Sequence, residues 1–168
     1  AQILTQKRQR DGYTFQEAND KMFERNYFGM MMVETGDADA FITGLYTKYS
    51  NTIKVANEVI GIRPEYKHFG TMHIINSAKG TLFISDTLIN QDPQAEELVD
   101  IAKLSATAVR FFNETPNIAM ISHSNFGSDT SAGSQKVRDA VRILQETCPE
   151  LAIEGEMQIG FALDKEMR

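Results

Sequence analysis

The sequence has a single cysteine, Cys148, and therefore excludes an internal disulfide. It also lacks a long apolar run: none approaches the roughly 20 residues that a transmembrane helix needs, and the first residues, Ala1–Thr5, do not form a signal peptide. Basic residues are outnumbered by acids, 17 to 23, and the net charge of −6 argues against nucleic acid or an anionic membrane as the main partner. We therefore expect a soluble, cytoplasmic protein that does not bind a membrane.

What the chain does contain is the apolar periodicity of an α/β protein. Its 168 residues suffice for one domain, which at this size buries roughly 70% of its unfolded surface. The periodicity predicts strands over residues 40–44, 71–76, 81–85, 117–122 and 151–153. It predicts helices over residues 15–32, 50–60, 92–113 and 134–148. The hairpin expected through residues 78–80 makes the predicted sheet mixed, although largely parallel, with helices flanking it.

The polar segment from Ser122 to Ser128 is the first candidate site. It follows the apolar run at residues 118–121 and precedes a predicted helix, so it connects a strand to a helix. Ligands collect at such loops, because helix amino termini offer unpaired N–H groups there. An ordinary polar loop is the alternative interpretation, and the lack of a Gly-Lys-Ser/Thr ending excludes a Walker-type P-loop. The candidate anion-binding residues of the loop are Ser122, Ser124, Asn125 and Ser128.

Paired carboxylates and one lysine are weaker candidates. Asp37 and Asp39 could bind a metal ion or cap a turn, and without a nearby histidine or third acid we assign no metal site. Glu154 and Glu156 would share one face of an extended strand, but neither has a visible partner for general-base chemistry. Lys54 lies near the start of the helix predicted at residues 50–60, where a helix favours negative charge, and this placement indicates a bound anion.

Four motifs in a fixed order resemble the phosphotransacetylase (phosphate acetyl/butyryl transferase) family. The resemblance extends over essentially all 168 residues, and it is closest to the C-terminal domain of bacterial NADP-dependent malic enzymes. It implies a two-subdomain fold of the isocitrate/isopropylmalate dehydrogenase type, a dimeric core, and a pocket between subdomains for coenzyme A and acetyl phosphate. The motifs are Gly36-Asp37-Ala38-Asp39, Leu82-Phe83-Ile84-Ser85-Asp86, the loop Ser122–Ser128, and Glu154-Gly155-Glu156-Met157-Gln158.

The same resemblance implies binding residues but no catalytic ones. Arg8 matches a family arginine at the phosphate site, and Thr52-Ile53-Lys54-Val55-Ala56 matches a Thr-x-Arg-Pro-Ala motif whose arginine contacts the anionic ligand. Lys54 keeps the charge of that arginine but loses its planar, bidentate geometry, so phosphate capture should be looser. The catalytic serine, arginine and aspartate of the family lie beyond Arg168. Arg8, Thr52 and Lys54 therefore join the loop residues as expected binding residues for phosphate or acetyl-CoA.

The function that the resemblance implies is a regulatory and oligomerisation domain of an NADP-dependent malic enzyme. Residues 1–168 would be part of a phosphotransacetylase-like domain, cut from a longer chain and lacking its C-terminal segment. The domain would bind acetyl-CoA or CoA, form a homo-oligomer, and contain no cofactor of its own. NADP and a divalent metal would bind the malate-oxidising portion in cis. The alternatives are a working phosphate acetyltransferase and a purely structural dimerisation domain.

Overall fold

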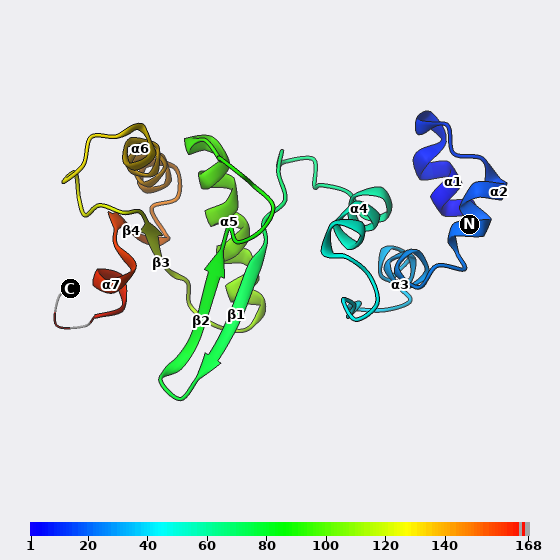
Figure 1. The fold of residues 1–168 in the computed structure, drawn as a ribbon, viewed down its shortest axis with the longest axis horizontal. Coiled ribbons are helices and arrows are strands. Elements are labelled where there is room, and N and C mark those ends of the chain that lie inside the picture. Colours follow the sequence, from blue (N-terminus) through cyan, green and yellow to red (C-terminus); the bar gives the residue numbers. More distant parts are fainter. Residues whose placement is uncertain (165, 167–168) are drawn as a thin grey trace. The chain divides into compact units, whose positions relative to one another are not determined.

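The computed structural model describes residues 1–164 and 166. It consists of two compact units, Ala1–Arg63 and Pro64–Arg168, which the blue-to-cyan and green-to-red segments of Figure 1 show. Each unit has a hydrophobic cluster of its own. Among residues 1–164 and 166, no helix has the length and apolar character needed to cross a membrane.

Unit 1 is helical throughout its regular structure. Its elements are α1 (Gln2–Arg8), the 3-10 helix η1 (Gln9–Asp11), α2 (Phe15–Lys21), α3 (Arg25–Glu34) and α4 (Tyr49–Val59). Each α-helix contributes apolar side chains to one cluster, because isolated helices this short are stable only when an apolar face is packed. The buried members of this cluster are Leu4, Ala18, Tyr27, Met30, Met31, Val55 and Val59.

Three expectations for unit 1 need correction. The single helix expected over residues 15–32 is wrong: α2 begins after Thr14, which forms a capping box with Glu17, but a turn at residues 22–24 separates it from α3. The strand expected over residues 40–44 is also wrong, because the segment pairs with no strand and Ile42 is 95% exposed. The helix expected over residues 50–60 is α4, and it begins slightly earlier than predicted, because its N-cap is Lys48.

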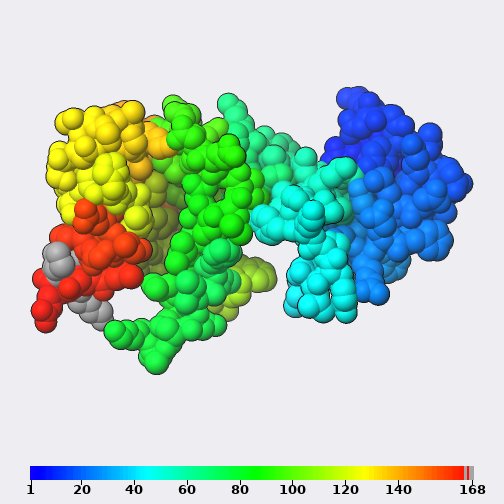
Figure 2. All heavy atoms as spheres, in the orientation of Figure 1, coloured from blue at the N-terminus to red at the C-terminus, as the bar shows by residue number. Residues whose placement is uncertain are grey.

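Unit 2 combines strands and helices, which confirms the α/β class. β1 (Met72–Ser77) and β2 (Gly80–Ser85) form the predicted antiparallel hairpin, whereas β3 (Asn117–Ile121) and β4 (Ala152–Met157) pair in parallel. The strands thus form two separate two-stranded sheets in the described residues, instead of one mixed sheet. In Figure 2 the far end of the β1–β2 hairpin projects from the body of its unit.

Two long helices build the core of unit 2 against the parallel pair of strands. They are α5 (Ala95–Phe111) and α6 (Ala132–Thr147), and the short α7 (Ile159–Leu163) follows β4. α5 starts after Gln94, which forms a capping box with Glu97, so it begins later than the helix expected from residue 92. The helix expected over residues 134–148 is present as α6, and its residues Ala140 and Leu144 are fully buried. The cluster joins Val99, Ala102, Ala106, Ala140, Leu144, Cys148, Leu151 and Ile153.

Candidate functional site

The candidate loop connects β3 to α6 and is folded onto buried polar groups. The Ser124 side chain is only 3% exposed, and its hydroxyl donates to Glu156 Oε1 over 2.7 Å. The hydroxyl oxygens of Ser124 and Ser122 lie 3.0 and 3.2 Å from that of Ser134, which is on α6 and fully buried. Two of the four predicted loop residues therefore direct their hydroxyls toward other protein groups.

Glu156, on β4, is the centre of this polar network. It is fully buried, and its Oε1 atom accepts hydrogen bonds from the Gly127 N–H at 2.9 Å and from Arg138 Nη1 at 3.0 Å, besides the Ser124 hydroxyl. Burial alone would raise the pKa of this carboxyl. The bonds from Ser124 and Gly127, together with the Arg138 charge, outweigh burial and lower the pKa below its usual value. Glu156 is thus an ionised structural group, and its burial prevents contact with a substrate.

A second carboxylate occupies the far end of the loop. Asp129 Oδ2 accepts from the Ser131 hydroxyl and from the Ser131 N–H at 3.1 Å, and it lies 3.0 Å from His123 Nε2. Bonds from the Ser131 hydroxyl and from Ser134 lower the pKa of Asp129 well below its usual range. Because Ser131 is the N-cap of α6, Asp129 supplies negative charge where the helix dipole favours it.

The two remaining predicted residues are more accessible. Asn125 is half-buried, and its Oδ1 accepts from the Gln158 N–H at 2.8 Å. Ser128 is exposed, and its hydroxyl oxygen accepts from the Asn125 N–H at 3.1 Å. Among the residues that the structure describes, the main-chain N–H groups of His123 and Ser124 have no hydrogen-bond partner. The loop can therefore offer a ligand the main-chain N–H of the exposed His123, whose imidazole is hydrogen-bonded to Asp129.

The other three predicted binding residues, Arg8, Thr52 and Lys54, lie in unit 1, and Lys54 is exposed. Its side chain is 71% exposed, and Nζ lies 3.8 Å from the Glu58 carboxylate, one helical turn further along α4. Glu58 Oε2 accepts hydrogen bonds from the Tyr13 hydroxyl at 2.6 Å and from the Tyr27 hydroxyl. Glu58 is therefore shared among several groups, and the Lys54 charge is only weakly neutralised.

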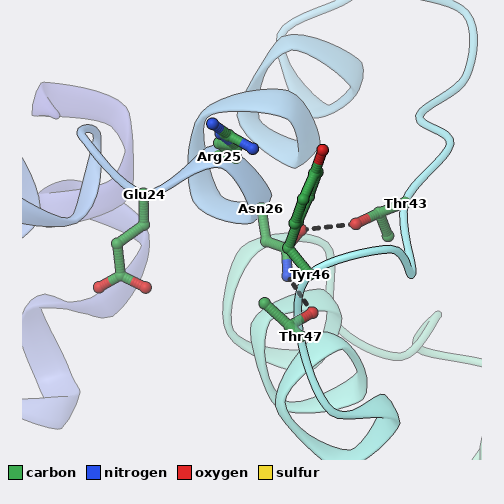
Figure 3. A pocket seen from close by; sticks show the side chains of 6 residues that line it. All are labelled: Glu24, Arg25, Asn26, Thr43, Tyr46 and Thr47. Carbon is green, nitrogen blue, oxygen red and sulfur yellow. Dashed lines mark hydrogen bonds between the residues drawn. The ribbon is translucent and has the colours of Figure 1, made fainter.

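Thr52 adjoins a surface pocket of unit 1. Its hydroxyl oxygen lies 3.1 Å from that of Thr47. Figure 3 shows the buried Asn26 side chain between Thr43 and Thr47, with hydrogen bonds of 2.7 and 3.2 Å. The Arg25 guanidinium carbon lies 4.9 Å from the centre of the Tyr46 ring. The pocket has a volume of about 450 Å³ and is lined by Glu24, Arg25, Asn26, Thr43, Tyr46 and Thr47.

The guanidinium group of Arg8 forms hydrogen bonds within unit 1. Its Nε atom donates to the Glu58 main-chain carbonyl, Nη2 donates to the Asn57 carbonyl, and Nη1 lies 3.2 Å from Asp11. Asp37, one of the predicted aspartate pair, has a local role, because Thr35 donates its hydroxyl hydrogen to it in the turn after α3. Within residues 1–164 and 166, no group of three or more His, Cys, Asp or Glu side chains could hold a metal ion.

Sequence reasoning missed the partners that organise the loop. Ser134 and Arg138 both lie on α6 at helical spacing, so they resembled ordinary helix residues. Glu156 was identified only as one half of a carboxylate pair, although Glu154 is exposed and Glu156 is fully buried. The one sequence feature that indicated a site here was a polar loop before a helix N-terminus. This feature does not reveal which acidic side chain is buried under the loop.

Comparisons with known proteins connect this chain to phosphate acetyl/butaryl transferases and to malic enzymes. Residues 1–168 match the family model of the phosphate acetyl/butaryl transferases. The chain is 38% identical over 160 residues to the NADP-dependent malic enzyme of Escherichia coli, a match that covers 95% of this chain and 21% of that enzyme. It is 34% identical over 160 residues to the phosphate acetyltransferase of Nitratidesulfovibrio vulgaris, covering 95% of this chain and 23% of that enzyme.

Solved structures agree on the fold. A phosphotransacetylase from Staphylococcus aureus superposes with a TM-score of 0.83 at 28% identity, covering 99% of this chain and 51% of its own. A phosphotransacetylase from Streptococcus pyogenes gives a TM-score of 0.81 at 32% identity, covering 94% and 49%. The expected phosphotransacetylase-like fold is thereby confirmed. The chain spans about half of these solved chains and about a fifth of the malic enzyme.

Proposed function

The chain belongs to the phosphate acetyl/butaryl transferase family, and we propose that it is a regulatory and oligomerisation domain of an NADP-dependent malic enzyme, with acetyl-CoA as its effector. In this role it assembles a homo-oligomer and works in the cytoplasm. Malate would be oxidatively decarboxylated to pyruvate by another portion of the same protein, which would also bind NADP and a divalent metal. The domain itself would contribute ligand binding and no chemistry.

The observation that carries this proposal is the identity to malic enzymes, which reaches 38%, compared with 34% to the phosphate acetyltransferase of Nitratidesulfovibrio vulgaris. At 38% identity, 95% of this chain aligns with only 21% of the Escherichia coli enzyme. A domain of this size within a much larger enzyme has room for a malate-oxidising portion beside it. An NAD-dependent malic enzyme of Rhizobium meliloti shows the same pattern: it is 34% identical, and the match covers 83% of this chain and 18% of that enzyme.

The accessible groups support an anionic effector. Lys54 is exposed and weakly paired, and the hydroxyl of Thr52 lies beside the Thr47 side chain that lines the pocket of unit 1. Acetyl-CoA carries several phosphate groups, for which a lysine supplies a point charge and hydroxyls supply hydrogen bonds. These features suit binding of a phosphorylated ligand.

The chemistry of the loop supports binding without turnover. Transfer of an acetyl group from phosphate to a thiol requires a base for the thiol, donors for the developing oxyanion and a cation for the leaving phosphate. The main-chain N–H group of His123 could serve as a donor. Glu156 is buried and cannot reach a thiol, whereas the exposed His123 imidazole, hydrogen-bonded to Asp129, is a candidate base. The described residues of the loop thus supply only part of what acyl transfer requires.

Calorimetric titration of the full natural chain with acetyl-CoA tests the proposal. We expect saturable binding that Lys54→Ala weakens about five- to tenfold, because an exposed charge-assisted hydrogen bond contributes about 1–1.5 kcal/mol. Lys54→Arg should retain the affinity. Lys79→Ala, which changes an exposed lysine in the β1–β2 turn, is the matched control and should bind as the wild type does. Absence of binding, or equal affinities in all variants, would refute the proposal.

The similarity to phosphate acetyltransferases supports a second candidate function. The 34% identity to the Nitratidesulfovibrio vulgaris enzyme favours conversion of acetyl phosphate and CoA into acetyl-CoA. Thioester formation by the full natural chain, compared with a protein-free reaction, separates the two functions. Turnover above that background would establish the transferase, whereas binding without turnover would support the regulatory role.

A further inference from the structure

We infer that Glu156 is a positioning residue, which holds the loop Ser122–Ser128 in the conformation that meets its ligand, with Arg138 as its partner. This inference rests on the proposed function, because it assumes that the loop meets a phosphorylated ligand. It adds two residues that make no ligand contact themselves and act through the loop.

The geometry shows how firmly Glu156 holds the loop. Its carboxylate binds the Ser124 hydroxyl and the Gly127 N–H, and its main-chain carbonyl accepts from the Phe126 N–H at 2.9 Å. Three points within four loop residues are thus attached to a single residue of β4. Arg138 completes the arrangement from α6, since its Nη1 also donates to the Asp129 carbonyl at 2.8 Å.

The charge on Glu156 is needed because three donors converge on one oxygen. Hydrogen bonds to an ionised carboxylate are roughly twice as strong as those between neutral groups. The other oxygen, Oε2, is buried without a hydrogen-bond partner in the described part of the chain, which is a cost that an apolar residue would avoid. Well-packed apolar residues can replace buried ion pairs without loss of stability. The presence of a carboxylate at this buried position therefore points to a role in fixing one loop conformation.

The loop conformation itself requires such an anchor. Phe126 has φ +45° and Gly127 has φ +87°, both in the left-handed region, and for a residue with a side chain this costs about 1 kcal/mol or more. In this conformation the N–H groups of His123 and Ser124 have no hydrogen-bond partner among the described residues, and of the two residues only His123 is exposed. Without Glu156, this part of the loop would keep its bonds to Ser134 and Gln158 but lose those that attach residues 124–127 to β4. A ligand would then have to order the loop on binding.

Glu156→Gln and its matched control Glu154→Gln test the inference in the full natural chain. Both changes remove one negative charge from the same strand, but Glu154 is exposed. The first measurement is amide hydrogen exchange at Phe126 and Gly127 without ligand. We expect exchange about tenfold or more faster in Glu156→Gln, since the loss of about 1.4 kcal/mol of local stability corresponds to tenfold, and no change in Glu154→Gln. Unchanged exchange in Glu156→Gln would overturn the inference.

The second measurement is acetyl-CoA affinity by calorimetry, which a merely structural role would not alter. We expect Glu156→Gln to weaken binding by a factor similar to the rise in exchange rate. If Glu156→Gln does not fold, Ser124→Ala is the replacement variant, because it removes the hydrogen bond to Glu156 without a charge change. It should raise the exchange rate and weaken acetyl-CoA binding, both by a smaller factor. Wild-type protein that does not bind acetyl-CoA would refute the proposed function. Faster exchange with unchanged affinity would leave that function standing and refute the positioning role.

Discussion

The Nε atom of Arg8 donates a hydrogen bond to the main-chain carbonyl of Glu58 over 2.6 Å. Nη2 of the same guanidinium donates to the Asn57 carbonyl, and Nη1 pairs with Asp11. These carbonyls belong to the last turn of α4, where a helix leaves its acceptors unpaired and favours positive charge. Arg8 thus caps α4 from α1, and a phosphate ligand would have to compete with these partners.

We predict that Arg8→Ala lowers the free energy of unfolding by about 1–3 kcal/mol, the range for hydrogen bonds from a charged group. Urea denaturation of the full natural chain measures this change. Arg10→Ala is the control, because Arg10 is an exposed cation two residues away, on η1. Equal losses in the two variants would show that the capping contacts contribute nothing beyond general charge effects.

Gly155 is the glycine whose replacement should be most disruptive. It has φ +136°, and a Cβ atom there would lie 2.5 Å from the Met120 carbonyl oxygen on β3. We therefore expect Gly155→Ala to destabilise the protein by about 2–4 kcal/mol, through overpacking and backbone strain together. Thermal unfolding followed by circular dichroism measures the loss. Gly160→Ala in α7 has open space around its Cβ, so a comparable loss there would contradict the steric explanation.

Acid should weaken the structure partly through Asp129. Because hydrogen bonds from Ser131 and Ser134 depress the pKa of Asp129 in the folded state, the group stabilises the fold above the unfolded pKa of about 3.9 and loses that contribution as the pH falls below about 4. Asp129→Asn should flatten the fall of unfolding free energy below about pH 5, down to about pH 2. Glu156 has a lowered pKa too, so some slope should remain. An unchanged acid profile in Asp129→Asn would contradict this assignment.

Tyr13 should ionise unusually late. Burial and its hydrogen bond to Glu58 raise the pKa of Tyr13 to about 12. Since the folded state holds this proton more tightly than the unfolded chain does, the associated stability is present below about pH 10 and is lost as the pH rises toward about 12. Absorbance titration of tyrosinate should therefore show a late-titrating phenol that Tyr13→Phe removes. If the phenol that Tyr13→Phe removes instead titrates near the ordinary value of about 10, the contact with Glu58 is refuted.

Amphipathic helices were the part of the fold that the sequence could predict. Ala140 and Leu144 lie at helical spacing, and both are fully buried in α6. Ile42 was expected in a strand because of its apolar neighbours, yet a strand requires a partner, and unit 1 provides none in the described residues. Local pattern specifies a helix through its own hydrogen bonds, whereas strand pairing depends on residues that are distant in sequence.

The candidate site was predictable in position but not in organisation. The loop Ser122–Ser128 does connect β3 to α6, as its flanking patterns indicated. That Ser124 is buried and bound to Glu156 depends on the register of β4 beside β3, 32 residues further along the chain. Likewise, the partners of Arg8 are at the end of α4, about 50 residues away. Contacts of this kind follow from tertiary packing, which a single sequence does not reveal.

The most direct test of the regulatory role is the rate of NADPH formation from malate by the full natural chain, measured with and without acetyl-CoA. The account predicts that acetyl-CoA changes this rate and that Lys54→Ala reduces the response, while Lys79→Ala responds as the wild type does. A rate that acetyl-CoA leaves unchanged, or a response that persists in full in Lys54→Ala, would contradict it.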